Sequence, residues 1–175
     1  WDGAAWTPAA FPPGGAEDAL RAVWGSGPSD VWAAGDAGLL LRWDGVAWSR
    51  VSNGFTGSFA SLWGSSVSDV WAATDTESVM HWDGAGWSLV PTPLRCGVGW
   101  WCGLYDVSGT GPTDVWAVGY DPYMSGGANG QLMHWEGTGW SQLPGGGSRH
   151  WIGVWAASPS EVWAAGSAVN KGDAG

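Results

Sequence analysis

Residues 70–87 read VWAATDTESVMHWDGAGW, and this stretch decides the fold because both of its ends recur along the chain. The triplet Val-Trp-Ala returns in steps of 39, 45 and 47 residues, with its tryptophan at Trp32, Trp71, Trp116 and Trp163. The motif Trp-Asp/Glu-Gly-x-x-Trp keeps one internal spacing and begins at Trp1, Trp43, Trp82 and Trp135. A third element, Val-Trp-Gly-Ser or a near relative, lies eight residues before the triplet tryptophan, at Trp24, Trp63 and Trp155, with Ser108 in its place in the third repeat. A period of about 40 residues is typical of one β-propeller blade.

Each repeat divides into four short runs separated by turn residues. In the first full repeat we expect strands at 20–24, 30–34, 39–43 and 48–51, because Gly27-Pro28-Ser29-Asp30 and Asp44-Gly45 are turn signals and the third run alternates apolar and polar residues. The sequence therefore predicts an all-β protein, a β-propeller with four-stranded antiparallel blades and about four blades' worth of chain. We expect one propeller domain over 1–175, part of a larger propeller, with blade segments 1–18 (partial), 19–54, 58–93, 103–145 and 150–175 (partial).

Composition explains how such a chain folds and excludes two classes of partner. Eighteen tryptophans, 31 glycines and 10 prolines stand among 175 residues, and large indole rings supply the apolar surface that the core needs. Sixteen acidic residues against six Lys and Arg give a net charge of −10, which repels nucleic acid and anionic membranes. No apolar run approaches the roughly 20 residues of a membrane span, so we expect no membrane insertion.

Two motifs carry a family resemblance. His81-Trp82-Asp83-Gly84 and Val115-Trp116-Ala117-Val118-Gly119 resemble bacterial secreted or cell-surface propeller repeats of the VWAxG...HWDGxxW type. The short Trp-rich blades are distantly similar to those of propeller lectins, whereas the sialidase-type box Ser-x-Asp-x-Gly-x-x-Trp is not reproduced. The resemblance implies a protein that is extracellular, on the cell surface or periplasmic. We expect no cofactor.

Two insertions interrupt the regular repeat, and both belong to the third blade. They cover residues 94–103 and 120–130 and should emerge on one face, where loops commonly carry function. We expect the ligand-binding residues there, together with the one further tryptophan outside the repeat: Trp100, Trp101, Tyr120, Asp121, Tyr123 and Trp151. The alternative is that Trp100 and Trp101 fold inward. Cys96 and Cys102 are spaced for a disulfide in an oxidising compartment, or are free thiols.

Other residues invite a functional hypothesis but have a simpler structural one. The fifteen tryptophans of the repeat should pack between blades. The acids that precede Val-Trp should cap turns rather than bind a ring of cations; they are Asp30, Asp69, Asp114 and Glu161. His81 and His134 occupy one strand position in successive blades, so we expect no shared metal. His150 is a weak candidate for the inserted face.

These observations predict a non-catalytic extracellular binding module. The preferred ligand is a carbohydrate or cell-surface glycoconjugate that stacks on the inserted aromatic rings. One alternative is a scaffolding propeller that docks a cell-surface protein, or another chain or segment that completes the propeller. The other alternative is a glycan-cleaving hydrolase, which would need a pair of carboxylates in one pocket.

Overall fold

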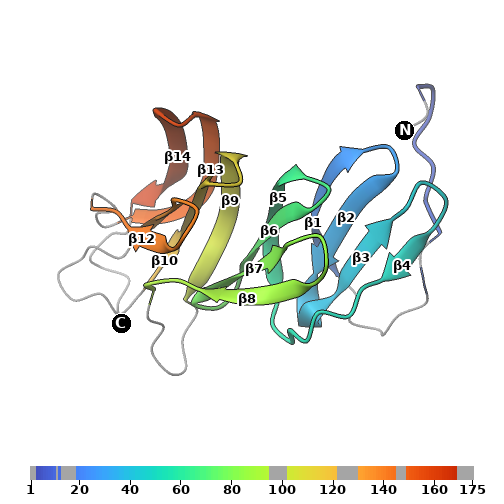
Figure 1. Ribbon diagram of the computed structural model, residues 1–175, viewed down its shortest axis with the longest axis horizontal. Coiled ribbons are helices and arrows are strands. Elements are labelled where there is room, and N and C mark those ends of the chain that lie inside the picture. The colour runs from blue at the N-terminus through green and yellow to red at the C-terminus, as the bar shows by residue number, and fades with distance from the viewer. Residues whose placement is uncertain are drawn as a thin grey trace.

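The computed structural model describes residues 3–10, 12, 19–94, 102–121, 130–144 and 149–168. Figure 1 shows these ranges as an open arc of β-sheets that stand side by side. The one helical element among them is a short 3₁₀ turn at Asp36–Gly38. Across the described ranges, no helix is long and apolar enough to cross a membrane.

Three sheets contain four antiparallel strands in chain order, and each is one propeller blade. The first blade consists of β1 (Leu20–Gly27), β2 (Asp30–Gly35), β3 (Leu40–Trp43) and β4 (Trp48–Arg50). The second consists of β5 (Phe59–Ser66), β6 (Asp69–Thr74), β7 (Ser78–Trp82) and β8 (Trp87–Pro91). The third consists of β9 (Gly103–Gly111), β10 (Asp114–Tyr120), β11 (Gly130–Trp135) and β12 (Trp140–Gln142). A fourth, two-stranded sheet is formed by β13 (Arg149–Ser158) and β14 (Glu161–Ala168). The predicted all-β class and four-stranded antiparallel blades are confirmed.

The hairpin between the third and fourth strands has the same backbone closure in the three four-stranded blades, and in the first two an aspartate side chain holds it as well. Asp44 Oδ1 accepts hydrogen bonds from the backbone N–H groups of Val46 and Ala47, and Asp83 does the same in the second blade. The following glycines have φ values of +96° at Gly45 and +93° at Gly84, a conformation that a side chain disfavours. The Trp-Asp-Gly motif is therefore a turn signal with a definite backbone requirement.

The first strand of each sheet carries a β-bulge near its start. One residue is left without a partner in the register of the neighbouring strand, and these residues are Arg21, Ala60, Tyr105 and Ile152. A bulge bends the strand and turns the extra side chain to a new direction. The position of the bulge repeats from blade to blade, although the residue type does not.

The core lies between blades rather than inside any one of them. Trp32 is fully buried, and its ring lies 5.2 Å from that of Trp82 and 5.3 Å from that of Trp87 in the next blade. One blade further on, Trp71 repeats the arrangement, with ring centroids 5.0 Å from Trp135 and 5.6 Å from Trp140. Each such pair of blades buries on the order of 150–250 Å² per indole. These contacts confirm, for the inner blades, that repeat tryptophans pack between blades.

The first strands of neighbouring blades are their inner strands, and a second tryptophan packs between them. This tryptophan lies on the first strand of one blade, and its ring covers a glycine on the first strand of the next blade. A Cβ added at Gly64 would stand 2.7 Å from Cη2 of Trp24, and one added at Gly109 would stand 2.7 Å from Cη2 of Trp63. Gly64 directly follows Trp63 on β5, and Gly109 directly follows Ser108 on β9. Each indole ring therefore reaches across one blade boundary. Only the absence of a side chain at the glycine admits the indole.

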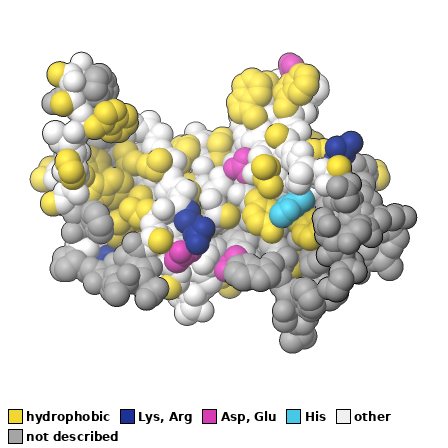
Figure 2. Space-filling view, turned by 180° about the vertical axis from the view of Figure 1, so that it is seen from behind, with side chains coloured by type: hydrophobic (Ala, Val, Ile, Leu, Met, Phe, Trp, Pro, Cys, Tyr) yellow, Lys and Arg dark blue, Asp and Glu magenta, His cyan; other side chains and the backbone are white. Residues whose placement is uncertain are grey.

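The packing prediction is wrong for three repeat tryptophans. Trp155 and Trp163 on β13 and β14 are 62% and 63% exposed, and Trp6 is 83% exposed. Figure 2 shows apolar side chains gathered on the projecting end of the molecule where β13 and β14 lie. The physical reason is positional, because no described strand packs against the outer side of these two strands. The sequence motif determines which tryptophan projects from the blade. Whether that tryptophan is buried depends on whether another blade packs against it.

Candidate functional site

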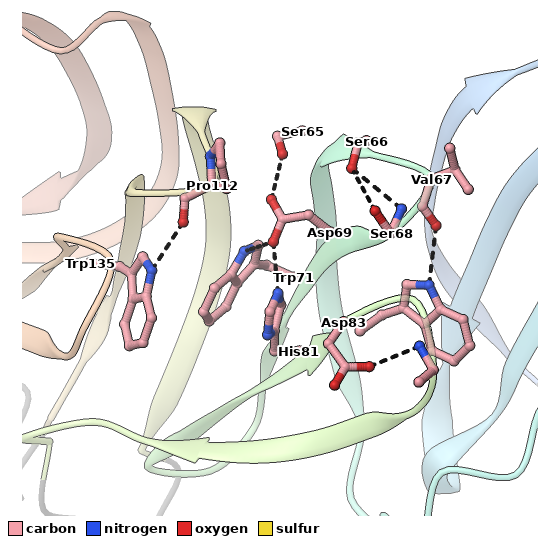
Figure 3. A network of polar contacts seen from close by, with 12 residues as sticks. Ser65, Ser66, Val67, Ser68, Asp69, Trp71, His81, Asp83, Pro112 and Trp135 are labelled. Carbon is pink, nitrogen blue, oxygen red and sulfur yellow. Dashed lines mark hydrogen bonds and ion pairs between the residues drawn. The ribbon is translucent and has the colours of Figure 1, made fainter.

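A carboxylate network recurs near the start of the second strand of each complete blade, and Figure 3 shows the version in the second blade. Asp69 accepts hydrogen bonds from Ser65 Oγ, from Trp71 Nε1 at 3.0 Å and from His81 Nε2 at 2.7 Å. Burial of Asp69 acts to raise the pKa of its carboxyl, but the bonds from His81, Ser65 and Trp71 outweigh burial and hold that pKa below its usual range. The group is therefore a fixed structural anion.

The other two complete blades repeat this network with small changes. Asp114 accepts from Thr110, from Trp116 Nε1 at 3.1 Å and from His134 Nε2 at 2.7 Å. In the first blade an arginine replaces the histidine, and the carboxylate of Asp30 accepts from Ser26 and from Arg42 Nε at 3.0 Å. The prediction that these acids cap the backbone of their turns is therefore wrong. Their partners are side chains, because the pleat brings the third-strand side chain beside the carboxylate.

The two histidines of this network are packing residues. His81 stacks on Trp71 with ring centroids 3.9 Å apart, and His134 stacks on Trp116 at the same distance. Each histidine binds the carboxylate of its own blade, so the two imidazoles belong to separate networks. Within the described ranges, no group of three or more His, Cys, Asp and Glu side chains is arranged to hold a metal ion.

A different carboxylate connects three blades. Asp106 on β9 accepts a hydrogen bond from Ser61 Oγ of the second blade at 2.5 Å and from the backbone N–H of Val154 on β13 at 2.8 Å. Both donors come from strands that lie on either side of β9. Asp106 thus fixes the spacing of adjacent inner strands.

An aromatic cluster lies between the third blade and β13, beside the inserted segments. The imidazole of His150 lies between two tyrosines, with ring centroids 4.9 Å from Tyr105 and 4.8 Å from Tyr120. Tyr105 is the bulged residue of β9 and Tyr120 is the last residue of β10, so both rings turn toward the start of β13. We call Tyr105, Tyr120 and His150 the aromatic cluster.

The aromatic cluster contains polar atoms as well as rings. His150 Nε2 is buried and has no hydrogen-bond partner among the described residues. Burial, followed by the nearby Tyr120, raises the pKa of the Tyr105 hydroxyl, so this phenol is neutral and able to donate. A buried polar atom without a partner costs free energy unless a ligand or water meets it. The cluster therefore offers a directional polar contact inside an aromatic surface.

Charged and aromatic groups surround this cluster. Asp121 directly follows Tyr120 and is only 3% exposed. On β13, the Arg149 guanidinium lies 5.7 Å from the ring centroid of Trp151 in a cation–π arrangement. The surroundings of the cluster thus combine the buried side chain of Asp121 with the exposed guanidinium of Arg149, which lies over the Trp151 ring.

The structure describes half of the predicted ligand-binding residues. Tyr120, Asp121 and Trp151 lie at or near the junction of the third blade with β13, whereas Trp100, Trp101 and Tyr123 lie outside the described residues. The ends of the two insertions do meet, because Gly103 pairs with Tyr120 and Tyr120 pairs with Gly130. The predicted Cys96–Cys102 disulfide also involves a residue outside the described ranges and stays a prediction, while Cys102 itself is buried in the core.

Sequence reasoning missed Tyr105 and undervalued His150. Tyr105 stands in a regular inner strand, where nothing local distinguishes it from its neighbours. The signal that could have found it is the bulge position, which the repeat aligns with Arg21, Ala60 and Ile152. His150 borders the repeat and its partners are 30 or more residues away in sequence, so only the tertiary structure identifies them.

Comparison with known proteins supports the architecture. No protein-family model matches the chain, and no curated protein matches it. Among solved structures, the chain is similar to that of YCF48 bound to D1 peptide, with a TM-score of 0.52 and 14% sequence identity. The match covers 71% of this chain and 39% of that one, so this chain spans well under half of its structural neighbour. At that identity, the similarity bears on the propeller fold alone.

Proposed function

We propose that this protein is a non-catalytic binding module, working outside the cytoplasm, which docks an extended peptide segment of a protein partner on the aromatic cluster. The single observation that carries the proposal is the buried, unpartnered Nε2 of His150 between Tyr105 and Tyr120. Large aromatic rings with a few placed polar atoms are typical of binding hot spots. The location rests on the resemblance to secreted and cell-surface repeats.

The surroundings of the cluster suit a peptide. Rings supply apolar contact for side chains, and the imidazole can exchange a hydrogen bond with a peptide amide. The chain has a net charge of −10, so its long-range field favours a neutral or basic partner segment. The structural neighbour YCF48 was itself solved with a bound peptide, which supports peptide docking as a use of this architecture.

A carbohydrate ligand stays a prediction from the sequence. Sugar rings also stack on indole and phenol, but no contact among the described residues favours a sugar over a peptide. The hydrolase alternative needs two carboxyls that face one pocket, and the nearby Asp106 carboxylate instead bonds to Ser61 and Val154.

The test selects displayed random peptides against the intact chain and measures the affinity of the selected peptides by calorimetry. We expect Tyr120→Ala and His150→Ala each to weaken binding tenfold or more, a loss of about 1.4 kcal/mol or above. The matched control is Val23→Ala, which truncates a 70% exposed side chain in the first blade and should leave affinity unchanged.

Two outcomes would contradict the proposal. One is a set of selected peptides whose binding is insensitive to both substitutions while the variants remain folded. The other is binding to a glycan array in the absence of any selected peptide, which would favour the carbohydrate ligand instead.

A further inference from the structure

Two side-chain positions lie close together at one end of each complete blade. They are the bulged residue of the first strand and the residue four places after the triplet tryptophan. In the first blade these positions hold Arg21 and Asp36, and the guanidinium donates from Nε to Oδ1 and from Nη2 to Oδ2, the latter at 2.9 Å. In the third blade the same positions hold Tyr105 and Tyr120 of the aromatic cluster. This end of a blade therefore carries either an ion pair or aromatic rings.

In the second blade the two positions leave a carboxylate without an internal cation. Ala60 stands in place of the arginine, and Asp75 is exposed. The backbone N–H of Ser58 donates to Asp75 Oδ1 at 2.9 Å, and across the described ranges no Lys, Arg or His side chain forms an ion pair with this carboxylate. Asp36, and after it Asp75, raises the pKa of the Arg21 guanidinium, so one cation lies near two carboxylates. One negative charge therefore remains at this point of the surface.

Asp75 borders the aromatic cluster through the start of β9. A Cβ added at Gly103 would stand 2.9 Å from Cα of Asp75, and Gly103 pairs with Tyr120 in the sheet of the third blade. Since the Cα atoms of paired antiparallel residues lie about 5 Å apart, the Cα atoms of Asp75 and Tyr120 are separated by no more than about 10 Å. A ligand a few residues long can therefore reach both the carboxylate and the cluster.

The cation of β13 belongs to the other side of that strand. Arg149 directly precedes His150, and successive side chains of a strand point to opposite faces. The guanidinium accordingly lies over the Trp151 ring, 5.7 Å from its centroid. Arg149 is therefore not placed to pair with an acidic ligand that contacts His150.

We propose that the peptide docked on the aromatic cluster carries an arginine or lysine whose side chain pairs with Asp75. The inference rests on the proposed docking function and names the chemistry of its ligand. An extended chain rises about 3.3 Å per residue, so a separation of about 10 Å corresponds to about three residues. The basic residue is therefore expected about two to four positions from the residue that packs on the cluster, because side chains on one face of an extended chain are two residues apart. The contact of Arg21 with Asp36 is the same pair made inside the first blade.

The net charge of the chain and a local ion pair predict different behaviour. A net charge of −10 attracts any basic peptide, whereas a pair with Asp75 requires the cation at a definite place in the peptide. An exposed ion pair contributes only about two- to fivefold to affinity. The position of the basic residue in the peptide is therefore a sharper readout than total affinity.

The experiment selects random displayed peptides on the intact chain and on Asp75→Asn, and measures the affinity of resynthesised peptides by calorimetry. On the wild type we expect Arg or Lys at a fixed spacing from an aromatic or aliphatic residue, and on the variant no such spacing. Asp75→Asn keeps an oxygen for the Ser58 N–H and should weaken the peptides selected on the wild type by about two- to fivefold. Replacing the basic residue of the peptide by glutamine should have the same effect, and both changes together should weaken binding no more than either alone.

Two further variants separate the local pair from net charge. Glu136→Gln removes one exposed negative charge in the β11–β12 hairpin, at the opposite end of its blade, and should leave affinity unchanged. Ala60→Arg gives Asp75 the internal guanidinium that Asp36 has, and should weaken basic peptides about as much as Asp75→Asn does. Unfolding curves of each variant verify that the blades remain folded.

The outcomes distinguish this inference from the docking function. Selected peptides that depend on Tyr120 and His150 but have no basic residue at a fixed spacing would overturn the inference and leave peptide docking intact. Equal losses from Asp75→Asn and Glu136→Gln would also overturn it, because the effect would then be one of net charge. Peptides insensitive to Tyr120→Ala and His150→Ala would overturn the docking function itself, and this inference with it.

Discussion

The hydroxyl of Ser108 accepts a hydrogen bond from the backbone N–H of Ala156 at 3.2 Å, across the boundary between the third blade and β13. At the two preceding boundaries the residue in place of Ser108 is a tryptophan and the residue in place of Ala156 is a glycine. Tryptophan thus occurs opposite glycine, and serine occurs opposite alanine. The side chain on one blade is matched to the space that the next blade leaves.

This pairing predicts strong coupling between the two positions. Ser108→Trp alone should destabilise the fold by about 1–3 kcal/mol, because the indole would meet the Ala156 methyl group. Ala156→Gly alone should cost about 0.5–1 kcal/mol through backbone entropy. The double variant should be more stable than the sum of the single effects, with a coupling of about 0.5–3 kcal/mol in urea unfolding. Additive effects would show that the two positions are independent.

The glycines under the inner-strand tryptophans should tolerate no side chain. Gly64→Ala would place a Cβ 2.7 Å from Trp24 Cη2, and Gly109→Ala would do the same at Trp63. We expect each substitution to lower the free energy of unfolding by about 1–3 kcal/mol. Gly86→Ala is the matched control, because an added Cβ there meets no atom within 4 Å. Equal unfolding midpoints for all three variants would contradict the packing argument.

Lowering the pH should reduce the free energy of unfolding, because Asp69 in the second blade becomes protonated. Its carboxyl has a folded-state pKa below the unfolded value, so it contributes stability that is fully present above about pH 4 and is lost as the pH falls through the lowered pKa. Asp69→Asn should cost about 1–3 kcal/mol at neutral pH, and less below pH 4, because the lost bonds are charge-assisted. Urea unfolding between pH 2 and 7 measures the difference. A pH-independent difference between variant and wild type would show that the network is not charge-assisted.

The cysteine pair should oxidise. Cys102 is buried at the edge of the core between the second and third blades, and Cys96 lies six positions before it. A short loop between two cysteines closes at small entropic cost, so in an oxidising compartment we expect an intramolecular disulfide. Peptide mapping without reductant should recover the two cysteines as one linked fragment. Quantitative alkylation of both thiols under native, oxidising conditions would exclude the bond.

Much of the fold could be predicted from the sequence because its signals are local. The tryptophan spacings predicted the period, and the Asp-Gly turns predicted the hairpins, since a positive φ at glycine is a requirement of the turn itself. The predicted third strand, residues 39–43, differs from β3 by a single residue at its start. Local chemistry and regular repetition are sufficient for these features.

The candidate site could be predicted only in part. The insertions directed attention to Tyr120 and Asp121, but Tyr105 and His150 come from strands that are distant in the chain. Nothing in the residue types alone shows that a bulge turns Tyr105 toward β13, or that Asp69 binds a histidine twelve positions away. Such contacts depend on register and on the approach of neighbouring strands.

The sequence by itself determined the blade, its four strands, its turns and the tryptophans that project from it. Tertiary structure alone decided which of those tryptophans are buried, where each carboxylate finds its donors, and that His150 lies between two tyrosines. The physical reason is that a propeller blade has no core of its own. Its apolar side chains are buried by the next blade, so Trp32 is fully covered while Trp163, with the same local sequence, is 63% exposed.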